Sequence, residues 1–186
     1  MTDFFFKTRF FMPDDYFKTI YDIDFLSLKA NGILGLLIDV DNTLIPYDES
    51  LPSNQLIDFF NVLKNHGFKI MIISNNKVPR IQSFSALLKC PFIAKAKKPF
   101  SMSFKKAMKK LDITDKNSVC VIGDQLMTDV FGAKMFGLKC ILVDAIKRDN
   151  EKWFTRINRR FERRILKRIE NKYPSYFNDL NLHEKR

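Results

Sequence analysis

The stretch ILGLLIDVDNT, residues 33–43, decides which fold this chain of 186 residues adopts. Its first eight residues form a short apolar run that ends in carboxylates, a pattern typical of a buried strand. Strands are also predicted at 68–73, 92–94, 119–122 and 140–143, and helices at 53–66, 78–88, 101–111 and 126–136. Because these elements alternate with short connections, the sequence predicts an α/β fold with a mostly parallel sheet and helices on both faces.

Polar side chains follow four of the predicted strands, at the edge of the sheet where ligands bind in such folds. The four clusters are Asp39-Val40-Asp41-Asn42-Thr43, Ser74-Asn75-Asn76, Lys98-Pro99, and Gly123-Asp124-Gln125 with Thr128-Asp129. Carboxylates two residues apart, such as Asp39 and Asp41, can share a metal ion through one side chain and one backbone carbonyl. The second side chain then stays free for proton transfer. Further carboxylates at another strand end suit Mg2+, which prefers oxygen ligands.

Each cluster also has an ordinary structural interpretation when it is taken alone. Asp, Asn and Ser are favoured in turns and helix caps, so residues 39–43 and 74–76 need no catalytic role. Lys95, Lys97 and Lys98 can equally form a solvated run of charge. The clusters become informative because they occur together, in a definite order, at strand ends.

This order resembles the four motifs of the haloacid dehalogenase-like (HAD) phosphohydrolases over residues 33–144. Asp39 and Asp41 match the first motif, Ser74 the second, Lys98 the third, and Asp124 with Asp129 the fourth. A narrower resemblance, over residues 11–167, is to the YqeG family of bacterial HAD phosphatases of type IIIA. Its most characteristic part is GDQLMTDV at residues 123–130. The resemblance implies a Rossmann-like HAD core.

The resemblance also implies a role for each matched residue. Asp39 is expected to attack phosphorus and become an aspartyl phosphate, and Asp41 to act as general acid and then general base. Mg2+ is expected to be held by Asp39, Asp41 through its carbonyl, and Asp124, with Asp129 supporting the site. Thr43, Ser74, Asn75 and Lys98 are expected to bind phosphoryl oxygens, and Lys98 also to act in catalysis.

The spacing of the motifs bears on the substrate, because cap domains in this superfamily are inserted between them. The segments 43–74 and 74–98 are fully used by one helix and one strand each, which predicts a capless, open site. An open site suits a phosphate on a large molecule, and eukaryotic relatives of the YqeG family are phosphatidylglycerophosphate phosphatases. Three alternatives stay open: a soluble sugar-phosphate or nucleotide phosphatase, a nucleic-acid-end phosphatase, and a non-catalytic scaffold module.

The composition excludes several classes of protein. With 46% hydrophobic and 28% charged residues, the chain is neither intrinsically disordered nor of low complexity. No apolar run approaches the roughly 18 residues of a transmembrane helix. Two histidines are too few for a His-built zinc site, and three cysteines without a close pair fit a reducing cytoplasm.

The net charge of +11 points to a polyanionic partner. Residues 147–172 carry eleven Lys or Arg and four Asp or Glu. An apolar stripe recurs there at helical spacing: Trp153, Phe154, Ile157, Phe161, Ile165 and Ile169. Its basic flank includes Arg159, Arg160, Arg163 and Arg164. We expect a helix that packs its stripe on the core and exposes this flank, either to solvent alone or to anionic lipid at the inner face of the membrane.

Nucleic acid is a less favoured partner for the same basic flank, and the oligomeric state is left open. Three parts of the chain are expected. Residues 1–32 form an N-terminal extension that packs on the core, residues 33–146 form the phosphatase core, and residues 147–186 form a basic helix with a loose tail.

Overall fold

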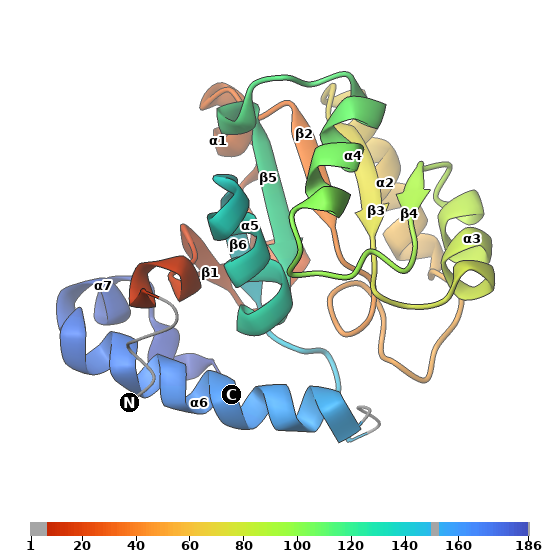
Figure 1. Cartoon of the computed structure of the whole chain (residues 1–186). Coiled ribbons are helices and arrows are strands. Elements are labelled where there is room, and N and C mark those ends of the chain that lie inside the picture. Colours follow the sequence, from red (N-terminus) through yellow and green to blue (C-terminus); the bar gives the residue numbers. More distant parts are fainter. Residues whose placement is uncertain (1–6, 150–152, 186) are drawn as a thin grey trace.

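The computed structural model describes residues 7–149 and 153–185, and the side chains of Trp153 and Phe154 lie outside the described part. Within it, a six-stranded sheet has the order β1-β6-β5-β2-β3-β4, and all neighbouring strands are parallel. The strands are β1 (Asp15–Phe17), β2 (Gly35–Ile38), β3 (Lys69–Ile73), β4 (Phe92–Ile93), β5 (Val119–Gly123) and β6 (Lys139–Val143). The helices are α1 (Phe25–Ala30), α2 (Asn54–Asn65), α3 (Val78–Leu87), α4 (Met102–Leu111), α5 (Phe131–Phe136), α6 (Trp153–Lys172) and α7 (Pro174–Asp179). The predicted α/β class and parallel sheet are confirmed (Figure 1).

The alternation of side chains along β2 divides the core into two layers. Leu36 and Ile38 lie in the layer formed with α1, α2 and α3. Leu37 lies on the opposite face, in the layer formed with α4, α5 and the C-terminal helices. Because β2 is central and buried on both faces, it reads as a continuous apolar run rather than an alternating one.

Local signals account for most element boundaries. The Ser53 hydroxyl accepts a hydrogen bond from Leu56 N at 3.2 Å and caps α2. Gly137 ends α5 with a positive φ of 83°, which a residue without Cβ adopts easily. The segment 126–136, expected as one helix, is instead a π-helical turn at Leu126–Val130 followed by α5.

The N-terminal residues also contribute to the sheet. Strand β1 pairs with β6 in parallel, with Asp15 opposite Ile141 and Phe17 opposite Val143. The segment before residue 33 therefore extends one edge of the sheet beyond the elements that the sequence predicted.

The C-terminal tail is ordered, which corrects the expectation of a loose tail. Helix α6 is followed by α7, and Phe177 and Leu182 are buried in the same cluster as residues of α5. In Figure 1, α6 runs along one end of the domain. The tail is therefore held by the same hydrophobic burial that holds the core.

The orientation of α6 corrects a second expectation. Ile169 is buried and Ile165 partly buried, but Ile157 and Phe161 keep exposures of 40% and 44%. The described side chains that are buried in the first half of α6 are polar: Thr155, Arg159 and Glu162. Of the stripe residues whose side chains the structure describes, only those in the second half of the helix pack inward.

The buried tail predicts that Phe177→Ala lowers the free energy of unfolding by about 3–5 kcal/mol, the usual cost of truncating a buried Phe. Chemical denaturation monitored by circular dichroism measures this change. Tyr173→Ala, at an exposed position just before α7, is the matched control and should stay within about 0.5 kcal/mol. Equal effects of the two substitutions would contradict a packed tail.

Candidate active site

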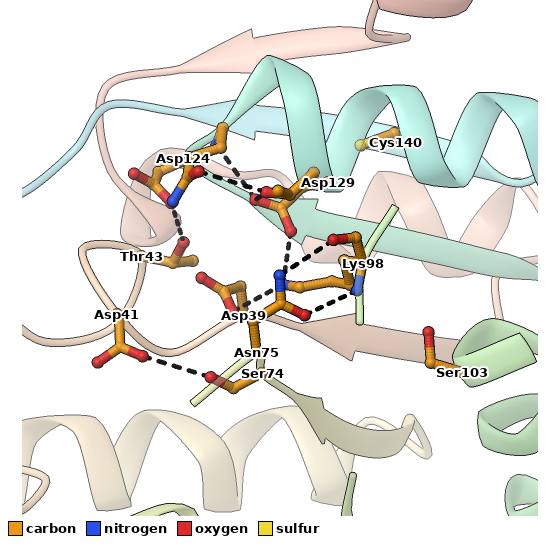
Figure 2. Close-up of polar contacts among 12 residues, drawn as sticks. Asp39, Asp41, Thr43, Ser74, Asn75, Lys98, Ser103, Asp124, Asp129 and Cys140 are labelled. Carbon is orange, nitrogen blue, oxygen red and sulfur yellow. Dashed lines mark hydrogen bonds and ion pairs between the residues drawn. The ribbon is translucent and has the colours of Figure 1, made fainter. Parts of the chain in front are cut away.

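The predicted site residues converge at the carboxyl ends of the central strands. Asp39 follows β2 directly, Ser74 follows β3, and Asp124 follows β5. Lys98 comes from the loop after β4, and Asp129 comes from the π-helical turn before α5. Figure 2 shows these side chains gathered around one space.

Lys98 links two carboxylates across this space. Its Nζ donates to Asp39 Oδ1 at 2.7 Å and to Asp129 Oδ1 at 2.6 Å (Figure 2). Burial by itself lowers the pKa of Lys98, but the two carboxylates outweigh it and raise that pKa above its ordinary value. Lys98 therefore stays protonated.

Asn75 fixes the backbone of Lys98 from both sides. Its Oδ1 accepts from Lys98 N at 2.7 Å, and its Nδ2 donates to Lys98 O at 3.1 Å. Asn75 was expected to bind phosphoryl oxygens. In this structure its amide is engaged in holding the loop that carries Lys98.

Three carboxylates form a buried cluster that could hold a metal ion. One oxygen each of Asp39, Asp124 and Asp129 lie within 4.8 Å of one another. Burial, followed by repulsion from neighbouring carboxylates, raises the pKa of Asp39 well above its ordinary value although Lys98 opposes the shift. Burial also raises the pKa of Asp129. An all-oxygen donor set suits Mg2+, and a divalent cation would relieve this repulsion, so the residues fit the ion.

Gly123 leaves the room in which this cluster forms. A Cβ at this position would lie 2.3 Å from Asp129 Cγ, far inside contact distance. Any larger residue at the end of β5 would displace Asp129 from the cluster.

The Asp41 carboxylate lies apart from the cluster. Arg80 Nε and Nη2 donate to its Oδ1 at 3.1 and 2.9 Å. Its Oδ2 accepts from Ser74 Oγ and from Asn76 Nδ2, both at 3.3 Å. In Figure 2 the Asp41 side chain points toward Ser74, away from Asp39. The Asp41 carboxylate is therefore not part of the metal cluster. That its backbone carbonyl binds the metal ion stays a prediction.

Thr43 is buried beside the carboxylate cluster, and its predicted role in phosphate binding stays a prediction. Its Oγ1 donates to Asp124 Oδ1 at 3.3 Å, and it is not among the described residues that line the pocket. Its observed contact is with a carboxylate of the cluster.

The C-terminal segment contributes site residues that sequence reasoning missed. Arg159 forms an ion pair with Asp124 Oδ2, and its Nη1 donates to Asp124 O at 2.9 Å and to Glu162 Oε2 at 3.0 Å. Lys185 Nζ donates to Asp124 O at 3.1 Å. Arg159 was expected on the exposed basic flank; that prediction is wrong, since it is only 6% exposed. The signal available was the Arg159–Glu162 spacing, which places both on one helix face.

A pocket of about 780 Å³ opens in front of Asp39 and Lys98. Ser74, Asn75, Asn76 and Gln125 supply polar groups to its lining. An apolar wall consists of Pro99, Phe100, Met127, Phe131 and Met135. Thr155 and Asn158 of α6 also line the pocket, so the C-terminal helix bounds it without any domain inserted between the motifs.

Comparison with known proteins agrees with this geometry. The HAD-hydrolase-like family model matches residues 95–153. The "Probable phosphatase YqeG" of Bacillus subtilis (strain 168) is 40% identical over 164 residues, covering 88% of this chain and 94% of that protein.

Two solved structures share the fold. An uncharacterized protein from Listeria monocytogenes serotype 4b aligns with a TM-score of 0.52 and 18% identity, over 64% of this chain and 85% of that one. A putative HAD family hydrolase from Streptomyces avermitilis MA-4680 aligns with a TM-score of 0.50 and 16% identity, over 64% and 76%. At these identities the likeness shows the fold alone.

The raised pKa values of Asp39 and Asp129 predict that Mg2+ stabilises the protein in a pH-dependent way. A cation needs the ionised carboxylates, so protons compete with it as the pH falls. Without the ion, stability should decrease as the pH rises through the raised pKa, because the ionised carboxylates repel one another.

Thermal melting with and without Mg2+ measures this effect. At a hundredfold excess over its Kd the ion should add about 2.7 kcal/mol. The increment should be larger at about pH 8 than at about pH 5. Asp124→Asn should reduce it, and an increment independent of pH would count against a carboxylate site.

Proposed function

The chain belongs to the YqeG family of HAD-type phosphatases, and from this premise we propose that it hydrolyses phosphomonoesters in a Mg2+-dependent reaction through an aspartyl phosphate on Asp39. One observation carries the proposal. Asp39 lies at the pocket beside a protonated lysine and within a cluster of buried carboxylates. The same membership in a phosphatase family disfavours the alternative of a non-catalytic scaffold.

In the first step an Asp39 carboxylate oxygen forms a bond to phosphorus while the bond from phosphorus to the alcohol oxygen breaks. Asp41 gives a proton to the leaving alcohol. Lys98 offsets negative charge on the phosphoryl oxygens, which a largely electrostatic transition state requires. Bound Mg2+, held by Asp39, Asp124 and Asp129, would offset the repulsion between the Asp39 carboxylate and the phosphate.

In the second step Asp41 accepts a proton from water, which attacks phosphorus and releases phosphate, so that Asp39 is regenerated. Asp41 already lines the pocket, so for either step its carboxylate exchanges its contacts with Arg80 and Ser74 for contacts with the leaving alcohol or water.

Asp39→Asn is expected to remove hydrolysis of a small phosphate ester, because the amide cannot form a stable acyl phosphate. The fold should persist, since Asn is nearly isosteric and the strand end stays polar. Phosphate release measures activity, and thermal melting checks the fold. Asp58→Asn, on the exposed face of α2, is the control and should hydrolyse at the wild-type rate. A variant at position 39 that keeps most of its rate would exclude the covalent mechanism.

The apolar wall of the pocket favours an amphiphilic substrate, such as phosphatidylglycerophosphate. Phe100 of this wall is 70% exposed, and Met102, two residues further along the chain, is 81% exposed. Apolar surface of this kind beside a phosphate site suits an acyl chain or lipid backbone. No described helix is long and apolar enough to span a bilayer.

Helix α6 offers a surface for such an approach. Phe161 follows the pocket-lining Asn158 by three residues, so it lies on an adjacent face of the helix. Exposed arginines accompany it: Arg156, Arg160, Arg163 and Arg164. Each basic residue near an anionic lipid surface contributes about 1 kcal/mol, and exposed apolar side chains favour the interface.

We expect the protein to bind vesicles that contain phosphatidylglycerol and not vesicles of neutral lipid. Reversal of Arg160, Arg163 and Arg164 to Glu should weaken binding by at least about a hundredfold, because three favourable charges are lost and three unfavourable ones appear. Co-sedimentation across salt measures it, since salt screens exposed charges within about 8 Å at physiological ionic strength. Arg159 is left unchanged because it is buried in the site.

The outcomes separate the candidate substrates. Hydrolysis of a soluble ester should survive the triple reversal. Salt-sensitive binding to DNA or RNA without lipid preference would favour the nucleic-acid-end phosphatase. Binding to neither would favour a soluble sugar-phosphate or nucleotide substrate.

A further inference from the structure

Three buried charged residues of the C-terminal segment contact one short loop of the site. Arg159, Glu162 and Lys185 are each at least nine-tenths buried. All three contact the backbone or side chain of residues 124–126. Buried ion pairs give little net stability compared with apolar packing, so stability alone is a weak explanation for this arrangement.

The contacts restrain both the position and the rotation of Asp124. The Arg159 guanidinium holds Oδ2 of this residue with one nitrogen and the carbonyl of the same residue with another, while Thr43 Oγ1 donates to the remaining Oδ1. A planar guanidinium can make such a two-point contact, whereas a lysine ammonium is a single point of charge.

Glu162 holds the guanidinium in turn. Its Oε2 accepts from Arg159 Nη1 at 3.0 Å, and its Oε1 accepts from Leu126 N at 2.7 Å. Glu162 therefore holds both the loop after β5 and the Arg159 side chain, which orients Asp124.

We propose that Arg159 is a positioning residue of the phosphatase site, which fixes Asp124 in the orientation that binds Mg2+. The proposal rests on the function proposed above. It makes the C-terminal helix a part of the catalytic unit, although that helix lies outside the four motifs.

The test compares Arg159→Gln with Lys167→Gln, which removes one positive charge from an exposed position of the same helix. Isothermal titration of Mg2+ without substrate gives the binding affinity, and the Mg2+ dependence of hydrolysis of a soluble ester gives a second readout. For Arg159→Gln we expect the Mg2+ Kd to rise ten- to a hundredfold, a loss typical of residues that orient metal ligands. The rate should recover at saturating Mg2+ with the KM for the ester unchanged. Lys167→Gln should leave the Mg2+ Kd, the rate at saturating Mg2+ and the KM for the ester at wild-type values.

The direction in which the Mg2+ Kd changes distinguishes a positioning role from a purely electrostatic effect. Removal of a cation beside Asp124 should by charge alone tighten Mg2+ binding. Weaker binding supports positioning, and unchanged or tighter binding overturns it. Arg159→Lys should also bind Mg2+ more weakly than wild type, because it restores the charge without the two-point contact.

Glu162→Gln keeps the proposal testable if Arg159→Gln does not fold. The amide oxygen can still accept from Leu126 N, but the charged contact to Arg159 is lost. The Mg2+ Kd should rise by a smaller factor, and an unchanged Kd would overturn the proposal. Because loss of a negative charge by itself also weakens cation binding, a rise supports positioning only if Arg159→Lys, which keeps the charge of the wild type, binds Mg2+ more weakly as well. If the wild type binds Mg2+ and Arg159→Gln weakens that binding while no phosphate ester is hydrolysed, the proposed function fails and the positioning role stands.

Discussion

Lys98 lies between two buried carboxylates, Asp39 and Asp129, and the rest of the site depends on the charge balance it maintains. Carboxylates taken out of water and placed close together resist ionisation, which is why the pKa values of both are raised. The buried ammonium group of Lys98 lowers these two pKa values, but both stay above their ordinary values. The remaining negative charge of the cluster therefore favours binding of a further cation. Asp39, the nucleophile of the proposed mechanism, lies beside the positive charge of Lys98.

The negative charge of the buried carboxylates also explains why polar side chains of the C-terminal segment face inward. Asp124 is a third buried carboxylate, and its partner is not Lys98 but Arg159. Glu162 balances Arg159, and Lys185 reaches the Asp124 carbonyl from the end of the chain. Burial lowers the pKa of Lys185 to about 8, although neighbouring carboxylates oppose the shift. The charged residues of α6 and the tail thus add to the balance of positive and negative charge around Lys98. Helix α6 also bounds the pocket, which a cap domain would otherwise cover.

The sequence determined the parallel sheet and the place of the polar clusters at the strand ends, because in each case the signal is local. Asp39 follows the apolar run of β2 immediately, so the pattern that predicts the strand also places the carboxylate at its end. The motifs after β3 and β5 are predictable for the same reason. Short connections between alternating elements then bring these strand ends together at one edge of the sheet.

Only the tertiary structure decided how the long-range partners are placed. Arg80 lies 39 residues from Asp41, and Arg159 lies 35 residues from Asp124. In the sequence only the spacing to Glu162 sets Arg159 apart from the exposed arginines beside it, and that spacing does not say which face of the helix is buried. The apolar periodicity of α6 pointed to the wrong face of its first half for the same reason. A side chain is buried according to the partners it meets, and here a buried carboxylate favoured a guanidinium over an isoleucine or a phenylalanine, because an unpaired charge in the interior is far more unfavourable than an exposed apolar side chain.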